Sequence, residues 1–84
     1  MNELETLKKK ITYRSKYRGT KEMDILLGNF VQSCINNLNI DELNDLDKLL
    51  NYEDFVLLNL HRNKTMIKKY DNLKLIDLFI NFKI

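Results

Sequence analysis

A short basic and aromatic segment holds the residues of this chain that are best suited to bind another molecule. Residues 13–24 read Tyr-Arg-Ser-Lys-Tyr-Arg-Gly-Thr-Lys-Glu-Met-Asp. Glycine costs about 1 kcal/mol relative to alanine inside a helix, so Gly19 predicts a corner between two helices. Glu22 follows Arg18 by four residues, and we expect the two side chains to flank this corner and to face solvent together. The alternative for this pair is an ordinary i,i+4 ion pair within the chain.

The sequence has no pattern that is typical of catalysis or of metal binding. His61 is the only histidine and Cys34 the only cysteine, so we expect no zinc cluster and no internal disulfide. No glycine-rich phosphate loop is present, and no motif holds a base beside a serine. Cys34 lies among apolar residues, which is typical of a small buried hydrophobe. We therefore expect a protein that is not an enzyme and binds no metal.

The charges are unevenly distributed, although the net charge is only +2. Residues 6–21 hold seven Lys or Arg and no acid, whereas residues 41–54 hold six acids and one Lys. Such asymmetry can orient a partner. The basic segment with Tyr13 and Tyr17 could also bind nucleic acid or an anionic membrane, or be a solvated helix face. Because no nucleic-acid motif is recognisable and the apolar face is thin, a protein-binding surface and a solvated helix face are both favoured over binding to nucleic acid or membrane.

Eighty-four residues make one small domain, 1–84, with a thin core. No stretch approaches the roughly 20 apolar residues of a membrane span, and the N-terminus lacks an apolar signal segment. A single cysteine is typical of a reducing compartment. We expect a soluble monomer that contacts neither membrane nor nucleic acid.

Apolar spacing predicts an all-α protein, a compact bundle of about five short helices. Asn39 with Glu42 indicates a capping box at the start of the third helix. Gly28, inside the second helix, would allow a neighbouring helix to approach closely. The fourth helix offers four apolar residues to the core, namely Phe55, Leu57, Leu58 and Leu60. The predicted helices are 3–17, 20–37, 40–50, 52–61 and 70–82, with 62–69 unassigned.

Residues 14–30 closely resemble the Arg-Gly-x-x-Glu segment of the succinate dehydrogenase assembly (flavinylation) factors. Downstream, residues 49–58 are similar to the Leu-Leu…Asp…Leu element of that family, so the resemblance covers roughly 11–60. Tyr17 stands where the family often has a second Arg, and Thr20 where it commonly has Met. Leu60 replaces an expected Trp, and a Pro that often starts the last helix is missing.

The resemblance implies an assembly factor that binds the flavoprotein subunit of succinate dehydrogenase, or of fumarate reductase, and promotes covalent attachment of FAD to it. FAD would belong to the partner and would not bind this chain stably. The bacterial cytoplasm is the expected compartment, with the mitochondrial matrix as the alternative. A small basic nucleic-acid-binding module and a purely structural adaptor are the alternative functions.

Carried onto this sequence, the resemblance implies a partner-binding site centred on Arg18, Gly19 and Glu22. Arg18 would donate to carboxylates or carbonyls of the flavoprotein. Gly19 would let the partner's backbone approach, and Glu22 would accept from a basic residue or brace Arg18. The rim of the site would consist of Tyr13, Arg14, Lys16 and Asp24.

Overall fold

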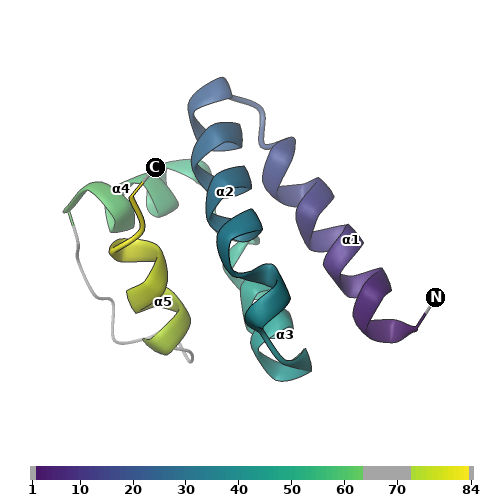
Figure 1. Cartoon of the computed structure of the whole chain (residues 1–84). Coiled ribbons are helices and arrows are strands. Elements are labelled where there is room, and N and C mark those ends of the chain that lie inside the picture. The colour runs from purple at the N-terminus through teal and green to yellow at the C-terminus, as the bar shows by residue number, and fades with distance from the viewer. Residues whose placement is uncertain (1, 64–72, 84) are drawn as a thin grey trace.

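The computed structural model describes residues 2–63 and 73–83 of the chain. In these ranges it has five α-helices, a short 3-10 turn and no strand, which confirms the all-α bundle (Figure 1). The elements are α1 Glu3–Lys16, α2 Lys21–Cys34, η1 Ile35–Asn37, α3 Ile40–Leu49, α4 Asp54–Asn63 and α5 Leu73–Ile80. None of the described helices is long and apolar enough to cross a membrane.

The first three helices begin at side-chain caps. The Asn2 side chain accepts from the backbone N–H of Glu5 at 2.8 Å, and the Thr20 hydroxyl accepts from Met23 at 3.3 Å. At α3 both bonds of the predicted capping box form: Glu42 N–H donates to Asn39 Oδ1 at 2.9 Å, and Asn39 N–H donates to Glu42 Oε1 at 3.0 Å. These bonds satisfy amide groups that the first turn of a helix otherwise leaves unpaired.

Several predicted boundaries shift by a few residues. The last turn of the second predicted helix tightens into η1. The fourth helix begins at Asp54, two residues later than predicted, because the carbonyl of Glu53 accepts the first helical bonds, from Val56 and Leu57. That helix continues to Asn63, and α5 covers the central part of the predicted 70–82. The predicted residues 70–72 and the unassigned 64–69 lie outside the described residues.

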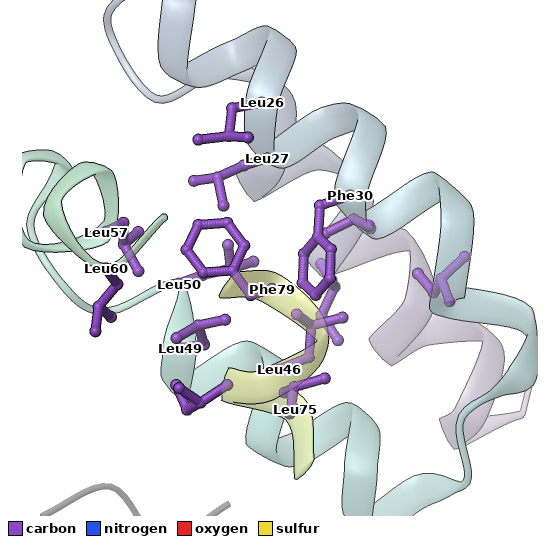
Figure 2. Packing of buried hydrophobic residues seen from close by; sticks show 14 of the residues in the cluster. Leu26, Leu27, Phe30, Leu46, Leu49, Leu50, Leu57, Leu60, Leu75 and Phe79 are labelled. Carbon is purple, nitrogen blue, oxygen red and sulfur yellow. The ribbon is translucent and has the colours of Figure 1, made fainter. Parts of the chain in front are cut away.

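The helices enclose one apolar core, with α2 at the centre of the bundle (Figure 1). Figure 2 shows Phe30 of α2 and Phe79 of α5 beside leucines from α2, α3, α4 and α5, and the two ring centroids lie 5.1 Å apart with the rings tilted edge to face. Such a geometry is favoured by the ring quadrupoles. The fully buried large side chains of the core include Phe30, Phe79, Ile11, Leu27, Leu43, Leu46, Leu50, Leu57 and Leu60.

Phe55, which the apolar pattern assigned to the core, is 63% exposed. It stands in the first turn of α4, where the helix buries Leu57 and Leu60 instead. The opposite deviation occurs in α1, where Ser15 is fully buried and donates its hydroxyl to the Thr12 carbonyl at 2.8 Å. That local bond satisfies the hydroxyl, so a polar residue is tolerated where α1 packs.

Helix α1 packs antiparallel to α2 and also contacts α3. Gly28 is buried in α2, and a Cβ built on it would lie 3.6 Å from Lys16 Cγ. The lysine stem thus covers the glycine, as predicted for a close helix approach, but the distance is an ordinary van der Waals contact. Alanine would therefore fit at this position.

Candidate functional site

The predicted site lies at the corner where α1 ends and α2 begins. Gly19 has a φ of 119°, in the left-handed region, which L-residues rarely adopt. The Asp24 carboxylate accepts the backbone N–H of Arg18 at 2.5 Å. Together with the Thr20 cap, this bond fixes the corner from the side of α2. The predicted corner at Gly19 is confirmed, and it is held by local bonds from backbone amides to the side chains of Asp24 and Thr20.

The Arg18 side chain does not face solvent with Glu22, and this expectation was wrong. The side chain is only 11% exposed and points to the turn between α3 and α4. Its Nε donates to Asp54 Oδ1 at 2.9 Å. Its two terminal nitrogens donate to the carbonyls of Leu50 at 2.5 Å and Tyr52 at 2.7 Å. Arg18 thus caps the carboxyl end of α3 and ties it to the first turn of α4.

Glu22 is more than half exposed and forms an ion pair with Arg62 near the end of α4. The i,i+4 pair with Arg18, which was the alternative within the chain, is therefore replaced by a pair with another helix. Both side chains of the observed pair are about 60% exposed, at 58% for Glu22 and 60% for Arg62. Water and salt screen such a pair, so it contributes about 0–1 kcal/mol to stability.

Gly19 presents bare backbone at the surface of the corner. It is exposed, and a Cβ built on it meets no atom within 4 Å apart from its two chain neighbours. Space for a Cβ therefore exists within this molecule, and the cost of adding that atom comes from φ. A steric demand for glycine at this position would have to come from a bound partner.

The four predicted rim residues divide into two groups. Tyr13 is 67% exposed, and Lys16 is exposed beside it on α1. Arg14 and Asp24 are half-buried and engaged within the chain: Arg14 donates to the carboxylate of Asp47 and, at 2.6 Å, to Asn51 Oδ1. Of the rim, Tyr13 and Lys16 are the side chains open to a partner.

Part of the charge asymmetry in the sequence is satisfied inside the molecule. Besides Arg14, Lys10 also binds Asp47, with Nζ 3.1 Å from Oδ2. One face of the basic helix α1 thus packs against the acidic helix α3, and Arg18 meets Asp54 in the same way. Three of the seven cations in residues 6–21, namely Lys10, Arg14 and Arg18, therefore pair with acids of the chain itself.

Tyr17 is a surface residue beside the site that was not predicted to belong to it. It is 68% exposed, and its ring centroid lies 4.7 Å from that of Tyr13. The i,i+4 spacing of two aromatic residues on a helix end could have indicated this pair. Among the described residues, no group of three His, Cys, Asp or Glu side chains could hold a metal ion.

Comparison with known proteins places this arrangement in a family. The curated relatives include succinate dehydrogenase assembly factor 2 of Dictyostelium discoideum, 43% identical over 54 residues, which are 64% of this chain and 38% of that protein. The corresponding protein of Caenorhabditis briggsae is 41% identical over 51 residues, 61% of this chain and 42% of the relative. The FAD assembly factor SdhE of Acetobacter pasteurianus is 34% identical over 47 residues, 56% of this chain and 43% of the relative.

The chain thus spans about two fifths of the length of these relatives. No solved structure shows significant similarity to it. The family model described as flavinator of succinate dehydrogenase matches residues 9–83, which include the corner and all helices from the middle of α1 onward. The chain therefore belongs to the succinate dehydrogenase flavinator family.

Proposed function

We propose that this chain binds the flavoprotein subunit of succinate dehydrogenase, or of a related fumarate reductase, and promotes covalent attachment of FAD to it. The observation that carries the proposal is the family match over residues 9–83. The printed names of the relatives, assembly factors for succinate dehydrogenase or for FAD, support it. FAD stays with the partner, and this chain supplies no catalytic group of its own.

The structure supports a binding role through the geometry of the corner. Exposed backbone at Gly19, with the exposed carboxylate of Glu22 three residues later, forms a small polar contact surface. Arg18 lies beneath it and fixes its position relative to α3 and α4. A surface held in one geometry loses little entropy when it binds. We therefore assign Gly19 and Glu22 to direct contact with the flavoprotein. Arg18 holds these two residues in position.

Such a protein would act by selecting a conformation of its partner. A ligand that binds one conformation more tightly than the others raises the population of that conformation. Here the favoured state would be one in which the flavoprotein holds FAD close to the residue that becomes linked to it. The compartment follows the partner, and relatives named for mitochondria and one from a bacterium both belong to the comparison.

Covalent flavin on the cognate flavoprotein tests the proposal. The flavoprotein is produced with and without this chain, denatured, and examined by in-gel flavin fluorescence. We expect fluorescence to depend on the chain. Equal fluorescence in both samples contradicts the assembly role and directs attention to the alternatives, a nucleic-acid-binding module or a structural adaptor.

Gly19→Arg is the variant that separates binding from folding. The added Cβ meets nothing beyond its chain neighbours and the position is exposed, so we expect the variant to fold at some cost in stability and to fail to support flavin attachment. Asn29→Arg is the matched control, because it adds the same charge at an exposed position of α2. Full flavin attachment by a folded Gly19→Arg chain would exclude contact at the corner.

A further inference from the structure

A second surface on α1 adjoins the corner and shares Tyr13 and Lys16 with its predicted rim. Lys8, Lys9, Tyr13, Lys16 and Tyr17 line an open groove of about 390 Å³, whose far side is formed by Ile35 and Asn36 of η1. None of the residues that line it is acidic. Both tyrosine rings are about two-thirds exposed, so the groove joins positive charge with a large aromatic surface.

The fold separates these lysines from the other cations of the basic segment. Lys10 and Arg14 face α3 and share Asp47, and Arg18 is bound to Asp54. Among the described residues, the lysines of the groove form no salt bridge, and no acid lines the groove. Glu5 lies one turn before Lys8 and Lys9 on α1, so the charge of these two lysines is partly offset, whereas no acid stands within one turn of Lys16 along the helix.

We propose that this groove binds a short acidic segment of the flavoprotein partner, as a contact additional to the corner. The inference rests on the proposed function for the identity of the partner. Lys9 and Lys16 are seven residues apart on one helix, a rise of about 10 Å. Three or four extended residues span that length. Carboxylates on such a segment would pair with the lysines, while its apolar atoms pack on Tyr13 and Tyr17.

The ion pairs that the arginines form within the chain favour an acidic peptide over nucleic acid as the ligand of the groove. Arginine binds phosphate in a bidentate manner and is the preferred residue for phosphate recognition. The chain has three arginines, and each forms an ion pair with an acid of the chain itself: Arg14 with Asp47, Arg18 with Asp54 and Arg62 with Glu22. The groove offers lysines alone, over the length of a single short segment.

Charge reversal in the groove tests the inference. The variant Lys9→Glu/Lys16→Glu changes two exposed positions, and a glutamate at position 16 retains the Cγ atom that lies against Gly28. The matched control is Lys48→Glu/Lys83→Glu, which changes the net charge equally at exposed positions of α3 and the C-terminal residues. Affinity for the flavoprotein is measured by calorimetry, and folding of each variant by circular dichroism.

We expect the groove variant to bind about tenfold or more weakly and the control to change less than about threefold, since close charge pairs at an interface add specific attraction. Raising KCl from about 50 to about 300 mM should narrow the difference, because salt screens exposed charges. An equal loss of affinity in both variants would show a general effect of net charge and would overturn the inference. Unchanged affinity of the groove variant would also overturn it.

The same experiment separates this inference from the proposed function. If the unmodified chain binds the flavoprotein and supports flavin attachment while the groove variant matches the control, only the groove inference fails. If the unmodified chain neither binds nor promotes attachment, both fail. Tighter binding of a single-stranded oligonucleotide than of the flavoprotein, lost in the groove variant, would likewise overturn the acidic-segment assignment.

Discussion

Arg18 and Asp54, 36 residues apart, join the α1–α2 corner to the first turn of α4 through a bond of 2.9 Å between Nε and Oδ1. The same guanidinium holds the carbonyls of Leu50 and Tyr52. One side chain therefore connects the most distinctive motif of the sequence to the turn between α3 and α4. Arg18 was expected to contact a partner, but its bonds instead fix the surface that a partner would contact.

This arrangement predicts that Arg18→Lys destabilises the chain although it preserves the charge. An ammonium group cannot reproduce the planar fork that reaches one carboxylate and two carbonyls. We expect a loss of about 1–3 kcal/mol in the free energy of unfolding, as for hydrogen bonds to charged groups that are removed. Urea unfolding followed by circular dichroism measures it.

Asp54→Asn separates a positioning role of Arg18 from direct contact. If Arg18 acts by holding the corner, Asp54→Asn and Arg18→Lys should both reduce flavin attachment, and their effects should be less than additive in a double-mutant cycle. Loss of attachment in Arg18→Lys together with full attachment in Asp54→Asn would indicate that Arg18 itself contacts the flavoprotein.

Local signals in the sequence predicted the helices and the cap of α3 well, whereas the caps of α1 and α2 at Asn2 and Thr20 were not predicted. The capping box of Asn39 and Glu42 depends on residues three apart, so sequence spacing alone determines it. Gly19 likewise marks its corner through a backbone preference of a single residue. The apolar stripe of α2 places Phe30 and its neighbours in the core because helical periodicity fixes which side chains share a face.

Contacts between residues far apart in the sequence could not be predicted from these local signals. The partners of Arg18 lie 32–36 residues away, and nothing in the local pattern indicates which turn the guanidinium will meet. The exposure of Phe55 has the same origin: it depends on how α4 sits on the bundle. Periodicity describes one helix at a time, whereas the docking of helices decides which end of an apolar face is covered.

Gly19→Ala should reduce stability without a steric clash inside the chain. The φ of 119° is strained for any residue with a Cβ, and nothing beyond the two chain neighbours lies within 4 Å of the added atom. We expect a loss of about 1–2 kcal/mol from the backbone conformation. Thermal unfolding measures the change, and a stabilised or unchanged Gly19→Ala chain would contradict the assigned backbone geometry.

A variant that loses a similar amount of stability at another junction shows whether Gly19 also contacts the partner. Asn39→Ala removes the cap of α3, at a different junction, and costs about 0.5–2 kcal/mol. If the backbone at Gly19 meets the flavoprotein, Gly19→Ala should lower flavin attachment well below the level of Asn39→Ala. Equal attachment by the two variants would assign the whole effect to stability.

Cys34 should react slowly with thiol reagents and weaken the fold at high pH. Burial raises the pKa of its thiol above the ordinary value, an effect that outweighs the opposing backbone hydrogen bond. As pH rises through the thiol pKa of the unfolded chain, the unfolded state loses a proton that the folded state retains. Stability that is present at lower pH is therefore lost as pH rises.

Comparison with Cys34→Ala isolates this effect. The difference in unfolding free energy between the parent chain and the variant should shrink as pH is raised above the ordinary thiol range, because alanine does not titrate. Alkylation of the folded chain by iodoacetamide should also accelerate on adding urea. A difference between the two chains that does not depend on pH would contradict the raised pKa.

Glu22 and Arg62 allow a direct test of whether the carboxylate of the motif serves the fold or the partner. Each substitution to alanine removes the same exposed ion pair, so each should change stability by less than about 1 kcal/mol. A carboxylate that only braces α4 predicts equal flavin attachment by Glu22→Ala and Arg62→Ala. A carboxylate that accepts from a basic residue of the flavoprotein predicts loss in Glu22→Ala alone, because removing Arg62 leaves that carboxylate in place and unpaired within the chain. We expect the second result, read by in-gel flavin fluorescence on the flavoprotein produced with each variant.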